Sequence, residues 1–444
     1  TIEFNGAYNG SEKFAPEFRF GFFASGGVGW MLSEESFMDR FEFLDMLKLR
    51  ASYGEIGDDN VAGRWLYMTQ WLYGGVDDNG RSRMSVTGQE PAFSPYTWFR
   101  EGALGNPQVR WERVAKLNLG TDFAVFEGLF AGSIDFFRDR RSDILIAGDQ
   151  RTVPVYFGAN APVGNIGIVE AQGFEFELRL SREFGTRRDL RLWSNINISH
   201  SQNRVLEADD PPMMPAYQQD ANFPMFQTRS FVDKGYFNTW DELFASTPHS
   251  VNDIRKLPGS FHILDYNADG VIDVNDNIPY GFPATPENTY NVSIGADWRG
   301  FSAFVQFYGV NNVNRQVVFH SFSGQNNLAF DEGTYWSEDN VNADVPLPRW
   351  NATPSEFSRG SRYMFDGSFL RLKNAEISYT FDSGFGWVNR ARLQNVRIFV
   401  SGNNLWLWTR MPDDRESNFA GTGWAAQGAY PTVKRYNFGV NITF

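Results

Sequence analysis

The C-terminal segment of the chain alternates strictly between apolar and polar side chains. Its apolar positions are Tyr436, Phe438, Val440, Ile442 and Phe444, and small or polar residues stand between them. A period of two places the two sets on opposite faces of a β-strand. Such a strand is stable where its two faces meet different surroundings, so the pattern constrains both the fold and its solvent.

The same alternation recurs along most of the chain. The segments 113–126, 166–182, 189–206 and 288–299 show it clearly. These segments run for roughly 12 to 18 residues, well beyond the ~5–6 residues of an ordinary strand. Helical patterns are scarce, and the best candidate for a short helix is 33–47, where acidic residues follow Ser33. We therefore predict an all-β chain.

Strand length and aromatic content distinguish between two all-β classes. A soluble sandwich also alternates, but long strands with aromatic ends are typical of a membrane barrel. Aromatic residues make up 16% of the chain, and Trp298, Trp406, Trp408 and Tyr430 lie near predicted strand ends. The uncharged run 153–169 is interrupted by proline and glycine, unlike a membrane-spanning helix. We predict a transmembrane antiparallel β-barrel.

The connection lengths give the barrel an orientation. Glu127-Gly128 and Arg299-Gly300 are typical of two-residue hairpin turns. Outer-membrane barrels place short turns in the periplasm and long loops outside the cell. The C-terminus is then periplasmic. The expected extracellular loops are 146–165, 207–287, 313–365 and 411–431.

The strand count follows from the same assignment. We expect about 12 spans, or 14 if the segments 63–75 and 82–90 also cross the membrane. An outward strand ends near residue 206, and the next inward strand begins near 288. The strand-like segment 230–240 is therefore expected to lie in an extracellular loop.

The composition excludes several classes of protein. The chain has no cysteine, which excludes disulfides, thiolate metal sites and a cysteine nucleophile. Its net charge of −13 argues against a nucleic-acid partner, because phosphate binding requires a basic surface. No nucleophile elbow or phosphate-binding loop is present, and the histidines lack metal-ligand spacing. We expect no enzyme activity and no organic cofactor.

Several motifs, taken in order, resemble one family. The chain is similar to the C-terminal barrel portion of SusC/RagA-type TonB-linked outer-membrane transporters. The motifs are GFFAS at 21–25 with GW at 29–30, SEESF at 33–37, LKLRASYG at 47–54, Asn106-Pro107, Trp111-Glu112, GIVEAQGFEFEL at 167–178, DYNADGVIDVND at 265–276, SFLRLKNAEISYT at 368–380, VRIFVSGNNL at 396–405 and Tyr430-Pro431.

The resemblance implies a fold and a function for the whole of 1–444. It implies part of a 22-stranded barrel, without the plug, in the outer membrane of a Gram-negative bacterium. It implies energy-coupled uptake of oligosaccharides or peptides with a SusD-like surface lipoprotein. TonB would act through upstream elements that are not in this chain. Two alternatives remain open: a plug-free porin, and a soluble calcium-dependent carbohydrate-binding or hydrolytic β-protein.

The segment 265–276 matches the twelve-residue calcium loop. Oxygen side chains stand at loop positions 1, 3, 5, 9 and 12, and Gly270 at position 6 allows the sharp turn. Position 12 carries an aspartate in place of the usual glutamate. The expected calcium ligands are Asp265, Asn267, Asp269, the carbonyl of Val271, Asp273 and Asp276. The alternative is an Asx-turn loop without a metal.

Other polar and aromatic residues have two interpretations each. Asp122, Glu175, Glu177 and Arg179 alternate onto the face expected to line the lumen, where charge tunes passage. The adjacent acids at 209–210 and 413–414 are better explained as loop charges than as catalytic carboxylates. The loop tryptophans could stack on sugars, although loop packing is the favoured interpretation; they are Trp240, Trp336, Trp350 and Trp424.

Overall fold

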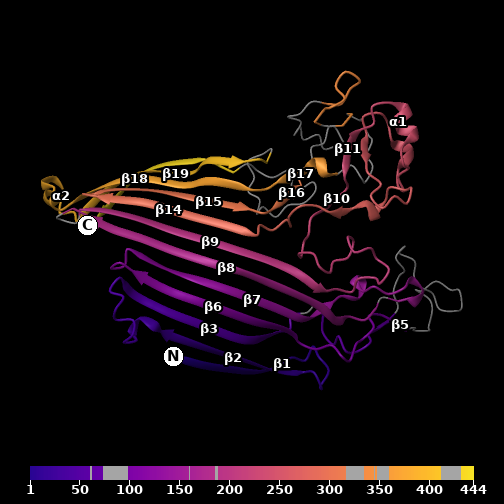
Figure 1. The fold of residues 1–444 in the computed structure, drawn as a ribbon, viewed down its shortest axis with the longest axis horizontal. Helices are drawn as coiled ribbons and strands as arrows, with labels where there is room; N and C mark the ends of the chain where they lie inside the picture. Colours follow the sequence, from indigo (N-terminus) through magenta and orange to yellow (C-terminus); the bar gives the residue numbers. More distant parts are fainter. Residues whose placement is uncertain are drawn as a thin grey trace.

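The main feature of the computed structural model is a single curved antiparallel sheet of twelve strands (Figure 1). Each strand pairs with the next strand of this sheet along the chain, which makes the topology a simple meander. The structure describes residues 1–60, 63–73, 99–159, 161–185, 189–316, 335–344, 346–347, 360–411 and 432–444.

The predicted strands are confirmed to within a few residues at each end. The sheet consists of β1 (Ile2–Gly10), β2 (Phe20–Met31), β3 (Leu44–Asp58), β6 (Glu112–Val125), β7 (Phe130–Ile146), β8 (Gly164–Phe184), β9 (Leu190–Glu207), β14 (Asn288–Trp298), β15 (Phe301–Asn311), β18 (Phe369–Asp382), β19 (Asn395–Thr409) and β20 (Arg435–Thr443). The sheet is open, because β1 and β20 each pair on one side.

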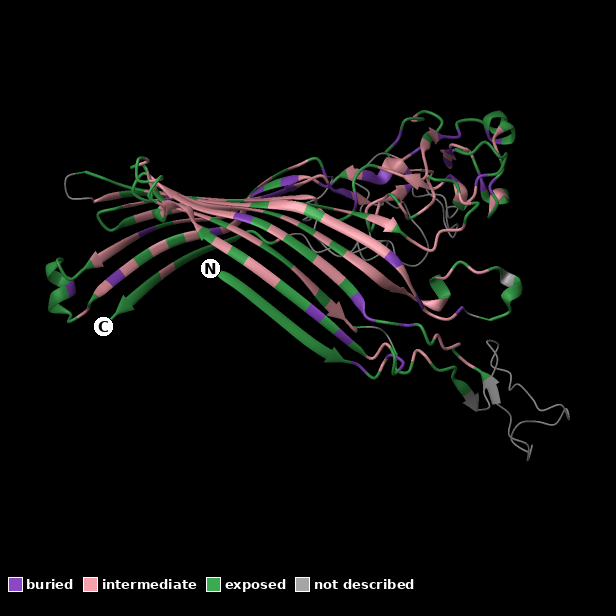
Figure 2. Ribbon diagram, turned by 60° about the horizontal axis from the view of Figure 1, so that its bottom comes forward, coloured by how far each residue is buried: buried purple, intermediate pink, exposed green. Residues whose placement is uncertain are grey.

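The register keeps one face of the sheet largely apolar over most of its length, and only near one end does this face carry charged pairs such as Arg138–Glu170. Leu119 of β6 lies opposite Phe136 of β7, which lies opposite Phe174 of β8. These side chains remain partly or largely exposed, and Phe136 is 58% accessible. Figure 2 shows that buried residues are sparse along the sheet and gather among the loops at one end. The middle of the sheet therefore has no closed apolar core, and the buried clusters that include its residues, such as Val310 with Phe369, lie near that end.

Short connections lie at one end of the sheet. The predicted hairpin at Arg299-Gly300 is confirmed, and both residues have positive φ, 46° and 89°. This conformation matches the twist of the flanking strands. The connection from β6 to β7 is longer than predicted, because β6 ends at Val125 and β7 begins at Phe130. The helix α2 (Gly386–Arg390) belongs to the same end (Figure 1).

The helix predicted over 33–47 is wrong. The structure has only a 3-10 turn, η1 (Leu32–Glu34), and β3 already begins at Leu44. The Trp30 indole donates a hydrogen bond of 2.7 Å to the Glu35 carboxylate, which holds the chain in a turn after β2. Pairing of β3 with β6 then competes successfully with the weak helical pattern.

The optional extra crossings receive no support from the described residues. In the described part of this region, 63–73, the strand is β4 (Trp71–Tyr73), which pairs with β5 (Phe99–Glu101) in a separate two-stranded sheet. The segment 82–90 lies outside the described residues. Twelve strands in the described sheet agree with the lower of the two predicted counts.

The long connections at the other end form a compact unit, here called the loop subdomain. It comprises the described residues of 208–287 and 335–366. As predicted, the strand-like segment 230–240 lies outside the main sheet. The elements at this end are α1 (Trp240–Ala245), β10 (Arg229–Ser230) paired with β13 (Ile278–Pro279), β11 (Asp233–Tyr236) paired with β12 (Phe261–Ile263), and β16 (Asn314–Gln316) paired with β17 (Met364–Asp366).

The loop subdomain has a conventional apolar core. Its buried members are Tyr236, Phe261, Ile263, Ile272, Trp336, Ala343 and Tyr363. The other 3-10 turns among the described residues are η3 (Gly148–Gln150), η4 (Val155–Phe157), η5 (Asp253–Arg255), η6 (Val274–Asp276) and η7 (Ser361–Tyr363). No helix among the described residues is long and apolar enough to cross a membrane.

Candidate functional site

The face of the sheet opposite the apolar one carries most of the polar side chains. Asp122, Glu175, Glu177 and Arg179 share this face, as predicted, because they alternate with Phe123, Phe176 and Leu178 in paired strands. In a closed barrel this is the face that lines the lumen. We call it the lumen face and divide it into a charged side and an amide-rich side.

The charged side extends over β3, β6, β7 and β8. Arg50 of β3 bridges two carboxylates, with its Nη2 2.9 Å from Asp122 Oδ1 and 3.0 Å from Asp135 Oδ2. These carboxylates belong to two consecutive strands, so one guanidinium ties three strands together. Sequence reasoning missed Arg50 as a partner. Its position on the polar face of an alternating strand was the available signal.

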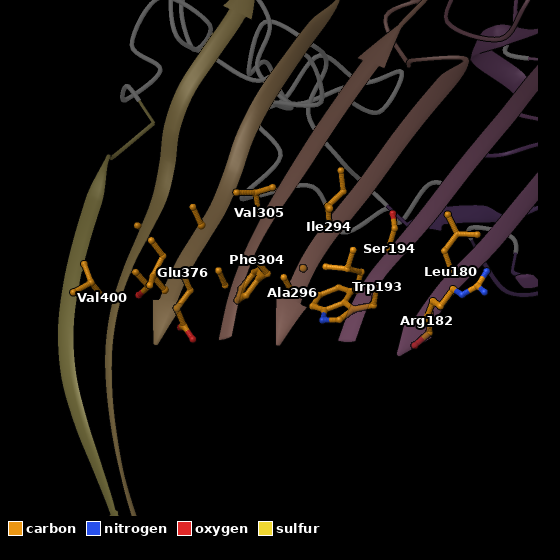
Figure 3. A pocket seen from close by; sticks show the side chains of 18 of the residues that line it. Leu180, Arg182, Trp193, Ser194, Ile294, Ala296, Phe304, Val305, Glu376 and Val400 are labelled. Atoms are coloured by element: carbon orange, nitrogen blue, oxygen red, sulfur yellow. The ribbon is translucent and has the colours of Figure 1, made fainter. Parts of the chain in front are cut away.

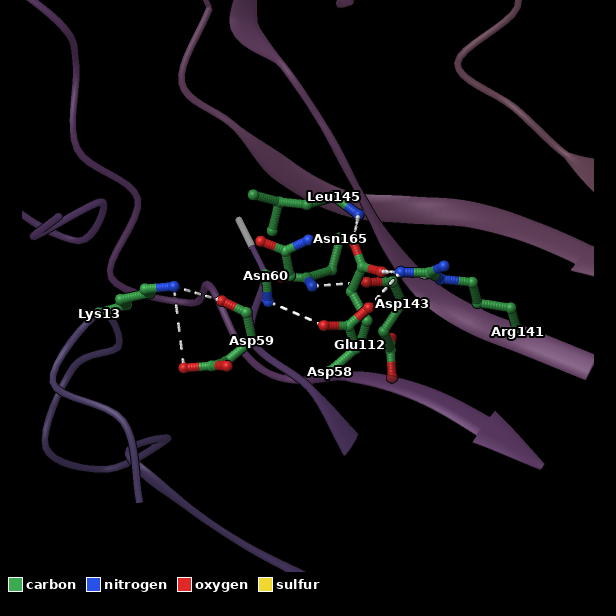
Figure 4. Close-up of polar contacts among 9 residues, drawn as sticks. All are labelled: Lys13, Asp58, Asp59, Asn60, Glu112, Arg141, Asp143, Leu145 and Asn165. Atoms are coloured by element: carbon green, nitrogen blue, oxygen red, sulfur yellow. Dashed lines mark hydrogen bonds and ion pairs between the residues drawn. The ribbon is translucent and has the colours of Figure 1, made fainter. Parts of the chain in front are cut away.

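A second ion-pair cluster closes the charged side at the long-loop end (Figure 4). The Glu112 carboxylate is 6% accessible and accepts hydrogen bonds from Arg141 Nε at 2.8 Å and from the Leu145 backbone N–H at 2.9 Å. Arg141 also donates to Asp58 at 2.8 Å. Lys13 donates to the neighbouring Asp59 carbonyl at 2.7 Å. The cluster therefore joins the ends of β3, β6 and β7, and Lys13 ties the connection between β1 and β2 to the end of β3.

The amide-rich side carries a ladder of amide side chains over β14 to β20, beside an ion pair between Arg397 and Glu376. Gln306 donates to Asn291 at 3.0 Å, Asn374 donates to Gln306, and Asn403 donates to Asn374. Asn437 continues the row at 3.4 Å from Asn403. The ladder crosses five consecutive strands at the position where β18 and β19 contain a bulge. Most amides in the row therefore have partners within the wall.

A polar recess of about 230 Å³ lies between the two sides. Its lining includes Asp135, Glu175, Asn197, Asn291 and Tyr308. Carboxylates and amides together make this recess a hydrogen-bonding surface for polar groups in the lumen. These groups could bind a polar solute or guide it through the lumen. No nucleophile–base pair lies among these lining residues.

The tryptophans predicted in the loops have different environments. Trp336 is buried in the core of the loop subdomain, and its indole donates to the Asn238 side chain at 3.1 Å. This confirms the packing interpretation for Trp336. Trp240 is 51% accessible and stacks against Phe244 on α1. Trp350 and Trp424 lie outside the described residues.

A buried polar cluster adjoins the core of the loop subdomain. Lys256 is 7% accessible and lies 2.6 Å from Asp253. Burial, together with the positive charge of Lys256, lowers the pKa of the nearby His249 to about 4. His249 also pairs through its backbone with Ile272, within the calcium-type loop. This cluster therefore connects that loop to the core.

The calcium-type loop adopts the tight turn expected from its sequence. Gly270 has a φ of 87°, a conformation that favours glycine. Its N–H donates to Asp265 Oδ2 at 3.0 Å, while the N–H groups of Asp269 and Val271 donate to the side chains of Asn267 and Asp269. Asp265 Oδ1 is shielded from solvent and has no hydrogen-bond partner.

The end of the loop folds back onto its beginning. Asp276 is fully buried, and its carboxylate accepts from the N–H groups of Tyr266 at 2.7 Å and Asp273 at 2.9 Å. Outside the loop, Tyr217 donates to the Asn275 carbonyl at 2.9 Å. Within the described residues, no three His, Cys, Asp or Glu side chains are grouped as metal ligands. The carboxylates of the loop instead accept from its own backbone.

The remaining candidate residues have structural roles. The Asp209 carboxylate lies 2.8 Å from Arg151, and Asp210 accepts from the N–H groups of Asp220 and Ala221. These contacts brace two long loops. The pair at 413–414 lies outside the described residues, as does His320. Of the other histidines, His200 contacts Asn288 on the sheet, and His262 stacks on Phe237 in the loop subdomain.

Comparisons with known proteins agree with this architecture. Residues 3–405 match the family described as TonB dependent receptor-like, beta-barrel. TonB-dependent receptor P3 of Formosa agariphila is 26% identical over 99% of this chain and 44% of its own length. TonB-dependent receptor SusC of Bacteroides thetaiotaomicron is 22% identical over 85% of this chain and 36% of its own.

Solved structures show the same fold. The RagAB peptide importer in its open-open state covers 100% of this chain and 45% of its own, with a TM-score of 0.71 and 17% identity. The chain thus spans less than half the length of the relatives that it matches. These relatives are named as receptors or importers rather than enzymes. The chain belongs to the TonB-dependent receptor-like β-barrel family, as a SusC/RagA-type barrel portion typical of the outer membrane of Gram-negative bacteria.

Proposed function

We propose that this chain forms the wall and outer loops of an energy-coupled outer-membrane importer of oligosaccharides or peptides. The observation that carries the proposal is a long-stranded sheet with an apolar outer face and a hydrogen-bonding lumen face. SusC and the RagAB importer share its sequence or fold. We further propose that a SusD-like lipoprotein covers the loops. TonB would act through elements outside this chain.

The orientation is part of the proposal. The long loops would face outward and the short turns would face the periplasm, as would the end of β20. The absence of cysteine permits a clean test, because single cysteines can be introduced at exposed serines at opposite ends of the sheet. Ser250 lies in the loop subdomain and Ser383 lies beside α2.

In intact cells, we expect a membrane-impermeant maleimide to label Ser250→Cys and to leave Ser383→Cys unlabelled. Both variants should react after the cells are opened, which controls for expression. If only Ser383→Cys were labelled in intact cells, the orientation of the sheet would be the opposite of the one proposed. Recovery of the protein without detergent would instead support a soluble β-protein.

Uptake provides the functional test. A strain that lacks the gene should lose uptake of either labelled peptides or labelled oligosaccharides, and TonB deletion should cause the same loss. The wild-type gene should restore uptake only when TonB is present. Uptake that is independent of TonB, together with constant conductance in a planar bilayer, would overturn the importer in favour of a porin.

We also propose that the loop 265–276 binds calcium through Asp265, Asn267, Asp269, the Val271 carbonyl, Asp273 and Asp276. The supporting observation is Asp265, whose Oδ2 accepts from Gly270 while its shielded Oδ1 has no partner. A carboxylate oxygen in that situation suits a hard cation. A cation would draw the other oxygens of the loop toward it and away from the backbone.

Calcium should protect the loop from limited proteolysis, and a chelator should remove the protection. Asp269→Ala should abolish the calcium effect, whereas the matched variant Asp241→Ala on exposed α1 should retain it. Isothermal titration should show one calcium site in the wild type and the control. If the wild type shows neither heat nor protection, the loop is an Asx-turn structure without a metal.

A further inference from the structure

A groove of about 790 Å³ crosses the apolar face of the sheet from β8 to β20 (Figure 3). Most of its lining comes from two neighbouring cross-strand rows. The first row is Leu180, Ser194, Ile294, Val305, Ala375, Gly402 and Tyr436, and the second is Arg182, Leu192, Ala296, Ala303, Ile377 and Val400. Pairing places both rows on the face that meets lipid in a membrane barrel.

Small side chains form the groove. The floor of the groove is made of small residues, namely Ser194, Ala296, Ala303, Ala375 and Gly402. Larger side chains flank them, namely Leu180, Ile294, Val400 and Tyr436. The volume lies within the range of 300–1,000 Å³ that is usual for small-molecule sites. The shape is therefore a trough for an apolar chain rather than a smooth hydrocarbon-facing surface.

The position of the groove relative to the sheet end indicates its depth in a membrane. The next row toward the short turns is rich in aromatic residues, including Phe184, Trp298, Phe301 and Tyr379. Trp298 stacks on Phe301 at 6.4 Å, and Phe301 contacts Tyr379 at 4.5 Å. Such rows lie at the membrane interface. The groove begins immediately on the hydrocarbon side of this row.

One cation stands at the end of the groove. Arg182 is exposed, and its guanidinium lies 5.7 Å from the ring centre of Phe184. No carboxylate pairs with it in the part of the chain that the structure describes. A charge on the lipid face is costly unless the side chain reaches the interface. A phosphate at that level would satisfy it, because arginine binds phosphate through two parallel hydrogen bonds.

We propose that this groove holds an acyl chain of one glycerophospholipid whose phosphate pairs with Arg182. The inference rests on the proposed membrane function of the sheet and adds a discrete lipid site to it. The lipid would belong to the leaflet on the short-turn side. Apolar lining and an interfacial cation occur together here, and they match the two parts of a phospholipid.

Native mass spectrometry of the detergent-solubilised protein tests the proposal. With phosphatidylglycerol as the probe, we expect one molecule to survive delipidation of the wild type. Ala303→Phe, which fills the trough, should reduce its retention more than tenfold. The matched variant Ala51→Phe lies on the same face of β3, outside the groove, and should retain the lipid.

The phosphate contact has a separate test. Arg182→Gln should weaken retention of phosphatidylglycerol about tenfold, because a charge-assisted pair is lost. It should not change retention of a diacylglycerol with the same acyl chains. Equal retention of phosphatidylglycerol by wild type, Ala303→Phe and Arg182→Gln would overturn the proposal. A protein that needs no detergent would instead refute the membrane function, so the two failures are distinguishable.

Discussion

The sheet and the loop subdomain arrange their apolar side chains in opposite ways. On the sheet, Phe136 and Ile377 are 58% and 65% accessible, and the polar groups lie on the lumen face. In the loop subdomain, Phe261 and Ile263 are 5% and 2% accessible and pack in a closed core. The sheet therefore exposes its apolar side chains, as a surface in lipid does, and the loop subdomain buries them, as a protein in water does. This difference in apolar burial marks the boundary between lipid and water along the strands.

The largest expected effect comes from the core of the loop subdomain. Phe261→Ala should cost about 3–5 kcal/mol there, because it removes a buried ring and leaves a cavity. Hydrogen exchange should show lost protection in β11 and β12, while β7 and β8 stay protected. Phe136→Ala on the sheet is the control and should cost less. Equal losses at both sites would remove the contrast between the two regions.

A charge on the sheet should distinguish its two faces. Leu119→Arg places a cation on the apolar face near the middle of β6, at a cost of about 2–4 kcal/mol in a bilayer. Asn118→Arg, one residue away, points into the lumen and should be tolerated. Urea unfolding in lipid vesicles measures both variants. If the two unfold alike, the apolar face does not meet hydrocarbon.

The smallest of these effects is the response of the loop subdomain to acid. The pKa of His249 is about 4 in the fold, against roughly 6.5 when unfolded. Below pH 6.5 the unfolded state binds the extra proton and the folded state does not, so stability falls until about pH 4. The loss is at most about 3 kcal/mol.

His249→Gln should flatten this pH dependence. Lys256, Asp253 and His262 also act on the His249 ring, and they remain in the variant. Proteolysis of the loop subdomain between pH 7 and pH 4 measures the effect. An unchanged acid response in His249→Gln would assign it to other groups.

The fold was predictable where its signal is local. Alternation within each strand specifies the faces, and the glycine of Arg299-Gly300 specifies a hairpin, so strand order and polarity followed from the sequence. The segment 33–47 was mispredicted because acidic residues after Ser33 suit a helix start, while pairing of Leu44 with Val125 is a long-range effect. The local sequence pattern does not show that strand pairing competes with helix formation in this segment.

The candidate sites were predictable only in part. Alternation placed Glu175 on the lumen face, but the partners of Arg50 depend on the register of three strands. The core of the loop subdomain joins Ile263 to Trp336 and Tyr363 through segments without periodicity. The calcium-type loop was visible because its spacing is local. The groove at Ala303 was invisible because it needs seven strands side by side.

The two sides of the lumen wall should respond differently to salt. Arg50 and its two carboxylates attract one another through charge, and dissolved ions weaken such attraction where water reaches it. The amide ladder from Asn291 to Asn437 carries no net charge and is insensitive to ionic strength. Rising salt would therefore weaken the ion pairs that join β3, β6 and β7, and also the Arg397–Glu376 pair between β18 and β19, while the amide ladder keeps its hydrogen bonds. The wall would lose stiffness where charges join its strands and keep it where amides do.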